Sequence, residues 1–65
     1  MKINDYKVKI ALAELGITQA QLADRCGISR QNISYILKKG RCLPATAGKI
    51  AAGLDVPVSS ITEEG

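Results

Sequence analysis

Apolar residues recur at helical spacing through the centre of the chain, between Thr18 and Ile36. The pattern predicts two short helices joined by a tight turn at Gly27, because glycine ends a helix by turning through positive φ without a Cβ clash. The small side chain of Ala23 favours a close crossing of the two helices. Their apolar faces consist of Leu22, Ala23 and Cys26 in the first helix and of Ile33, Ile36 and Leu37 in the second.

The same stretch contains the signals that begin each helix. Thr18 can cap the first helix, and Gln21 three residues later can complete a capping box. Ser29 can cap the second helix through its hydroxyl, with Ile28 packing back as a hydrophobic staple. We therefore expect the helical pair to extend over about 18–37, its second helix beginning at Ser29.

Three further helices are expected around this pair, over about 5–15, 43–54 and 58–61, followed by a frayed, acidic tail at 62–65. Asn4 or Asp5 can cap the first of them, and Pro44 suits the first turn of the second. The expected core residues of the two longer helices are Tyr6, Val8, Ala11, Leu12 and Leu15, then Leu43, Ala47, Ile50, Ala51 and Leu54. The pattern thus predicts one all-α domain of five helices over residues 1–65.

Length and composition agree with a small helical domain. Sixty-five residues are enough for one domain with a modest core, whose stability would gain from homodimerisation. The chain has neither Trp nor Phe, which suits a core of Leu, Ile, Val and Ala better than a β-sandwich. No apolar run approaches the roughly 18 residues of a membrane span, and the N-terminus lacks a signal-peptide core. We expect a cytoplasmic protein without membrane contact.

The side chains offer little for catalysis or for metal binding. There is no His, no neighbouring carboxylate pair outside the acidic tail and no Gly-rich phosphate loop, so neither a nucleophile with its base nor a metal site can be assembled. Cys26 and Cys42 lack the C-x-x-C spacing of a zinc site, and buried small hydrophobes are favoured for them over redox or metal roles. We expect no enzyme, no cofactor and no small-molecule ligand.

The net charge of +3 is unevenly distributed. Between Arg25 and Leu54 there are six basic residues and no acid, whereas all six acids lie outside this window. The basic residues are Arg25, Arg30, Lys38, Lys39, Arg41 and Lys49. A one-sided basic field is expected for a polyanion partner, although a merely solvated face gives the same pattern.

Four short motifs carry a family resemblance: Thr18-Gln19, Leu22-Ala23, Gly27-Ile28-Ser29 and Ile33-Ser34. Together they resemble the helix-turn-helix of the phage repressor and Cro-like (XRE-type) DNA-binding domains, and the resemblance extends from about Tyr6 to Ile61. It implies a compact lambda-repressor-like fold and a sequence-specific DNA-binding transcriptional regulator, most typically a small repressor of phage or mobile-element type. The loop at 38–41 departs from the commoner family pattern, which reaches its glycine one residue sooner.

The second helix of the pair would read the bases. Its outward face carries Arg30, Gln31, Ser34 and Tyr35, with Asn32 at its margin. Residues near the N-terminus of such a helix reach deepest into the major groove, so Arg30 is the candidate for guanine and Gln31 for adenine. Ser34 and Tyr35 follow one turn later. Tyr35 could instead donate to a phosphate or pack on an apolar neighbour, and Asn32 could cap the helix or touch a phosphate.

Other polar residues are candidates for the DNA backbone. Helix N-termini expose free N–H groups and the positive end of the helix dipole, which suits a phosphate, although the less favoured alternative for Gln19 is a solvated amide. Cations beyond the reading helix would also meet phosphates rather than bases, or would simply stabilise the helix C-terminus. The backbone candidates are Thr18, Gln19, Ser29, Asn32, Lys38, Lys39 and Arg41.

The resemblance also implies assembly. In relatives the fourth and fifth helices supply dimer contacts, for which Val56, Val58 and Ile61 are the apolar candidates here. A homodimer would bind double-stranded DNA at a pseudo-palindromic operator. The alternative is a protein-interaction module, such as the antitoxin partner of a toxin, in which DNA binding serves autoregulation. The short stretch after Ile61 favours the regulator, because antitoxins commonly carry an extra neutralising segment.

Overall fold

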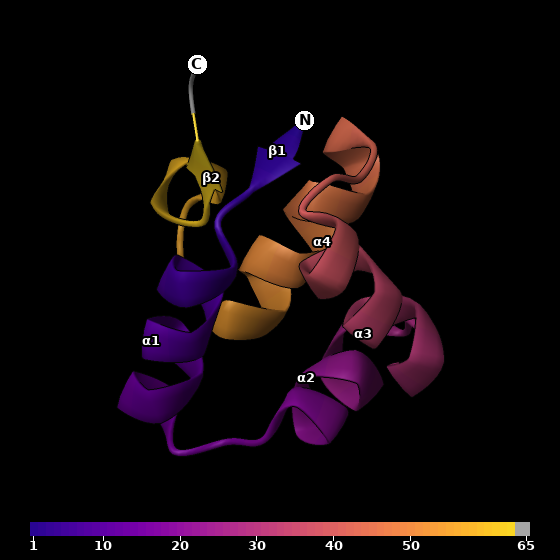
Figure 1. Ribbon diagram of the computed structural model, residues 1–65. Coiled ribbons are helices and arrows are strands. Elements are labelled where there is room, and N and C mark those ends of the chain that lie inside the picture. Colours follow the sequence, from indigo (N-terminus) through magenta and orange to yellow (C-terminus); the bar gives the residue numbers. More distant parts are fainter. Residues whose placement is uncertain (64–65) are drawn as a thin grey trace.

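Four α-helices form most of the computed structural model, which describes residues 1–63 (Figure 1). They are α1 (Asp5–Leu15), α2 (Gln19–Cys26), α3 (Arg30–Lys39) and α4 (Pro44–Leu54). The expected fifth helix is only a 3-10 turn, η1 (Val58–Ser60), so the count of five helices is not confirmed. The turn ends at Ile61, whose φ of −121° is no longer helical.

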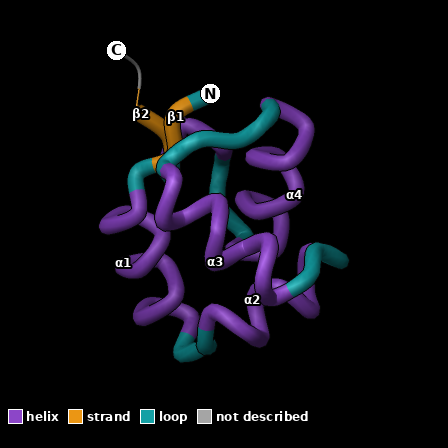
Figure 2. The backbone as a smooth tube through the Cα atoms, turned by 45° about the vertical axis from the view of Figure 1, so that its right-hand side comes forward, coloured by secondary structure: helices purple, strands orange, loops and turns teal. Residues whose placement is uncertain are grey.

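The two ends of the described chain form a small antiparallel sheet that the hydrophobic pattern did not predict. Strand β1 (Lys2–Ile3) pairs with β2 (Thr62–Glu63), and Ile3 lies opposite Thr62 (Figure 2). The expectation of a frayed tail is therefore wrong for Thr62 and Glu63, while 64–65 lie outside the described residues. The physical reason is burial: Ile3 is 5% exposed and Thr62 6%, and the Thr62 hydroxyl donates to the Val58 carbonyl at 3.1 Å.

Side-chain caps begin the first three helices as their sequences indicate. Asn4, rather than Asp5, caps α1 by accepting from the Lys7 amide. Thr18 and Gln21 form the expected capping box of α2. The Thr18 hydroxyl accepts from the backbone N–H of Gln21 at 3.1 Å, and the side-chain oxygen of Gln21 accepts from the backbone N–H of Thr18 at 2.8 Å. These bonds satisfy backbone N–H groups that have no partner within the helix.

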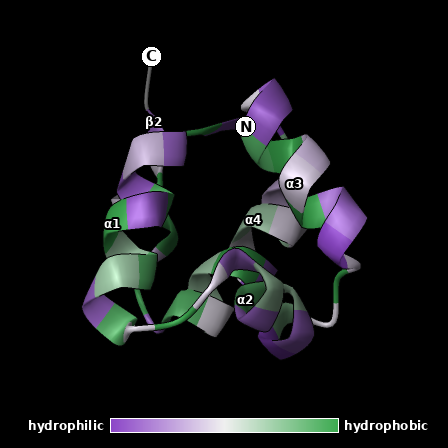
Figure 3. Ribbon diagram, turned by 60° about the horizontal axis from the view of Figure 1, so that its bottom comes forward, coloured by the Kyte–Doolittle hydropathy of each residue, from purple (hydrophilic) through white to green (hydrophobic). Residues whose placement is uncertain are grey.

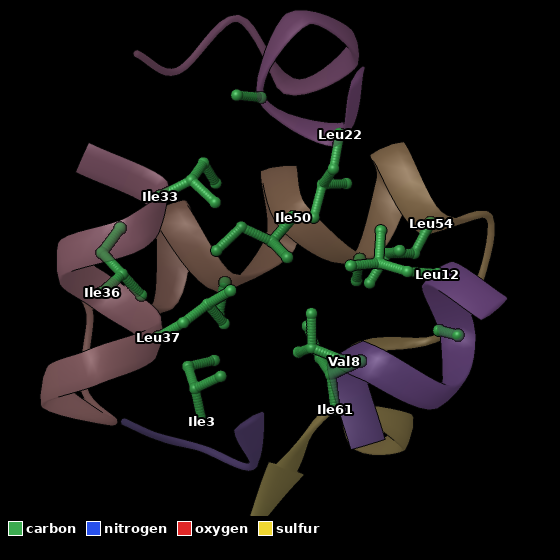
Figure 4. Packing of buried hydrophobic residues seen from close by; sticks show 14 residues of the cluster. Ile3, Val8, Leu12, Leu22, Ile33, Ile36, Leu37, Ile50, Leu54 and Ile61 are labelled. Carbon is green, nitrogen blue, oxygen red and sulfur yellow. The ribbon is translucent and has the colours of Figure 1, made fainter. Parts of the chain in front are cut away.

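One apolar core lies between the four helices and the terminal strands (Figure 4). Val8 and Leu12 from α1, Leu22 from α2, and Ile33, Ile36 and Leu37 from α3 point toward Ile50 and Leu54 of α4. Ile3 and Ile61 close the core beside β1 and β2. No helix in residues 1–63 combines the length and apolar character that a membrane crossing requires.

Three residues expected in this core lie outside it. Tyr6 is 72% exposed, because a step of about 100° per residue turns it roughly 160° away from the buried Val8. Leu15 is 39% exposed at the last turn of α1, where the chain leaves the core at Gly16. Leu43 is 73% exposed because it is the N-cap of α4 and lies before the helical periodicity begins.

Candidate nucleic-acid interface

The turn between α2 and α3 sets the direction of the exposed helix α3. Gly27 has a φ of 69°, and the backbone amide of Ile28 donates to the Ala23 carbonyl at 3.1 Å, so the chain changes direction within the three residues that separate α2 from α3. Ala23 is fully buried where α2 meets its neighbours, as its small size predicts. The hydroxyl of Ser29 then caps α3 by accepting from the backbone N–H of Asn32. Helix α3 extends to Lys39, two residues beyond the expected end at Leu37.

Helix α3 separates into a buried face and an exposed polar face. Its three buried residues are Ile33, Ile36 and Leu37. The four residues expected to contact bases are all exposed and lie together on the other side: Arg30, Gln31, Ser34 and Tyr35. Hydrophilic residues occupy both ends of this helix (Figure 3). The outward face therefore presents hydrogen-bonding groups on a helix whose apolar side is packed in the core.

Two shallow hollows lie on this face, on either side of Tyr35. Ser29, Gln31, Asn32 and Tyr35 line the first. Tyr35, Lys38 and Lys39 line the second, in which the Lys39 ammonium lies 6.0 Å from the centre of the Tyr35 ring. Tyr35 is 59% exposed, so its ring lies on the surface and not in the core. One hollow is thus lined by amides and hydroxyls, and the other by two cations and a phenol.

The basic end of α3 is held by the N-terminal strand. Gly40 ends α3 at a φ of 77°, and its carbonyl accepts from the Ile3 amide at 2.9 Å. Arg41 pairs with Lys2 across an isolated antiparallel bridge. Cross-strand partners have their side chains on the same side of the ladder, so Lys2 adds a cation beside Arg41. Sequence reasoning missed Lys2, because nothing local indicates that residue 2 lies against residue 41.

The capping hydroxyls of the two helices keep a free donor. Thr18 and Ser29 each use an oxygen lone pair to accept from a backbone N–H, which leaves the hydroxyl proton for another partner such as a phosphate. Gln19, in the first turn of α2, is half-buried, whereas Asn32 is exposed. The backbone candidates therefore lie in two groups, at the N-termini of α2 and α3 and at the C-terminal end of α3.

An ion pair links the two helices of the motif. Arg30, the first residue of α3, donates from Nη2 to Oδ2 of Asp24 on α2 at 3.2 Å. Both side chains are well exposed, at 67% and 64%. Sequence reasoning did not connect Asp24 with Arg30. The available signal was that Asp24 is the only acid between Glu14 and Asp55.

The two cysteines are half-buried and packed against the core. Burial raises the pKa of the Cys26 thiol, against the opposing effects of a backbone hydrogen bond with Gly53 and the charge of Arg25. Burial also raises the pKa of the Cys42 thiol. Both thiols are therefore protonated near neutral pH. The expectation that both are buried is met only in part, because each keeps some accessible surface.

Comparison with known proteins gives one clear match. A family model described as helix-turn-helix matches residues 8–61. This range includes α1 from Val8 onward, the whole of α2, α3 and α4, and η1. Neither a curated protein nor a solved structure matches the chain. The matched range covers most of the 65 residues and contains the α2–turn–α3 geometry described above. The chain therefore belongs to the helix-turn-helix family of the Cro and repressor (XRE) type, whose members are DNA-binding transcription regulators.

Proposed function

We propose that this protein is a sequence-specific DNA-binding regulator, of the small phage- or mobile-element-repressor kind, that reads the major groove with α3. The observation that carries the proposal is the division of α3 into a buried apolar face and an exposed polar one, without any acid from Arg25 to Leu54. Such a helix can enter the groove while its apolar side stays in the core. Cations at its C-terminal end provide the attraction to phosphates.

Within this proposal the exposed residues have two roles. Arg30 and Gln31, in the first turn of α3, contact base edges in a bidentate manner, and Ser34 and Tyr35 extend this surface by one turn. The second group positions the protein on the phosphates without reading sequence. It comprises Thr18, Gln19, Ser29 and Asn32 at the two helix N-termini, and Lys38, Lys39 and Arg41 beyond the reading helix.

Selection of bound sequences from a random duplex pool tests the proposal and identifies the site. Arg30→Ala should then weaken binding to the selected site by about 1–3 kcal/mol and relax the preference at one position, with little change on random DNA. Lys38→Ala should weaken both DNAs alike and lower the slope of log K against log salt by about one unit. Lys7→Ala is the matched control, an exposed lysine on α1 outside the interface. Failure to select any sequence would contradict the proposal.

Homodimeric binding is part of the same proposal, because one reading helix contacts too few base pairs for high specificity. We expect a pseudo-palindromic operator whose half-site centres lie roughly 34 Å apart. Of the three residues considered for the dimer contact, the prediction for Ile61 is wrong, because this residue is 1% exposed and belongs to the core. Val56 and Val58 are half-buried and keep some accessible surface. A one-to-one complex on an asymmetric site would contradict the dimer.

One observation favours a second candidate, a protein-interaction module of the antitoxin type. On α1 the outward side exposes Tyr6 and Ile10, at 72% and 43%, together with Ala13 one turn on. These residues can contact another protein without disturbing α3. If Arg30→Ala and Lys38→Ala leave DNA binding intact, and Tyr6→Ala abolishes capture of a protein partner, this second function replaces the first.

A further inference from the structure

Asp24 has an unusual position for an acid. It is the only carboxylate in α2, α3 and α4, and it lies next to the exposed polar face of α3. Its Oδ2 accepts from Nη2 of Arg30 at 3.2 Å, across the turn that contains Gly27. The residue proposed to read a base is therefore the one residue of α3 that has an acidic partner among residues 1–63.

Neither stability nor general affinity for DNA accounts for this carboxylate. The two side chains are 67% and 64% exposed, and an exposed ion pair contributes little to folding because water and salt screen it. A negative charge at this surface also repels the phosphates that the neighbouring cations attract. What the contact does determine is where the Arg30 guanidinium lies.

The geometry of the guanidinium makes this placement useful. Arginine has five N–H donors in a planar fork, and reading guanine requires a pair of them, directed at O6 and N7. Asp24 contacts one terminal nitrogen, Nη2, which leaves donors on the other nitrogens of the fork. A partner on one edge restricts the rotation of a long, exposed side chain and so reduces the conformational entropy lost on base contact.

We propose that Asp24 is a specificity-determining residue, which positions the guanidinium of Arg30 for a guanine edge and keeps it away from phosphates. When the base is not guanine, Arg30 stays paired with Asp24 and contributes little to binding. The inference rests on the proposed function, because it assumes that α3 reads the major groove. It goes further by assigning a role to an acid of α2 that does not itself contact the base.

Replacements that remove the charge of two aspartates test the inference. Asp24→Asn keeps the size of the side chain and removes its charge, and Asp24→Ala also removes the acceptor. The matched control is Asp55→Asn, which raises the net charge by the same amount at the C-cap of α4. Asp55 has a φ of 58°, a conformation that asparagine tolerates, so the control should fold normally. Binding is measured on the selected site, on its single-base variants and on random duplex, and melting temperatures verify folding.

Both Asp→Asn variants should bind random DNA somewhat more tightly, because each loses one negative charge. Only the Asp24 variants should lose preference, by about two- to fivefold, at the operator position that Arg30→Ala relaxes. In the Arg30→Ala background, Asp24→Asn should cause no further loss at that position, because the residue it positions is already absent.

An unchanged preference in both Asp24 variants, or an equal loss in Asp55→Asn, would overturn the inference while leaving the proposed function intact. The inference would also fail if Arg30→Ala relaxed no position in a protein that still selects a site. If no sequence is selected from the random pool, the proposed function fails as well, so the two failures are distinguishable.

Discussion

The two glycines inside α4 should respond differently to the same substitution. A Cβ added at Gly48 meets nothing within 4 Å, whereas one added at Gly53 would lie 2.6 Å from Sγ of Cys26 and 3.1 Å from Cδ1 of Leu22. Gly53 is therefore the point at which α4 approaches α2 closely. Neither glycine has positive φ, so alanine can adopt the backbone conformation at both positions.

The expected magnitudes follow from two effects. Replacing Gly with Ala within a helix stabilises the folded state by about 1 kcal/mol. Both positions should gain from this effect, but Gly53 should gain less because it lies near the end of α4. At Gly53 overpacking opposes it with about 1–3 kcal/mol, because Leu22 is fully buried and cannot move aside easily. We expect Gly48→Ala to stabilise the protein and Gly53→Ala to be less stable than Gly48→Ala by about 1–3 kcal/mol.

Urea unfolding followed by circular dichroism at 222 nm measures the difference. In a domain of this size, 1 kcal/mol also shifts the melting temperature by about 4–8 °C. Cys26→Ala removes the nearest atom, so the double variant with Gly53→Ala should be more stable than the sum of the single effects predicts. If Gly53→Ala stabilises the protein as much as Gly48→Ala, the close approach of α4 to α2 is wrong.

Three further predictions concern packing, capping and pH. Ala23→Leu should overpack the buried side of α2 and cost about 1–3 kcal/mol in a melting experiment, whereas Ala52→Leu on the exposed side of α4 should cost little. Thr18→Ala removes a cap and should cost about 0.5–2 kcal/mol in urea unfolding, while Thr18→Ser should retain most of the stability. The raised pKa values of Cys26 and Cys42 mean that the unfolded chain loses its thiol protons first, so stability should fall as pH rises above about 9. Replacing both cysteines with alanine should reduce this fall, and an unchanged pH dependence would contradict it.

Much of the helix-turn-helix could be predicted from the sequence, because its signals are local. A capping hydroxyl, a positive-φ glycine and apolar residues three or four positions apart act within one or two helical turns. The boundaries of α2, the caps at Thr18 and Ser29, the turn at Gly27 and the exposure of Arg30 and Gln31 all follow from such signals. The length of α3 was predicted less well. The helix continues beyond Leu37 through Lys38 and Lys39, which are both good helix formers.

The sequence by itself thus determined the helices, their caps and which face of α3 is polar. Only the tertiary structure decided which segments far apart in the chain contact each other. Ile3 becomes core and Thr62 becomes strand because residues 2–3 and 62–63 pair, a contact that no local pattern encodes. Lys2 reaches Arg41 through the same packing. The pairing of Asp24 with Arg30 depends on the angle between two helices, which the whole core sets through Ala23 and its neighbours.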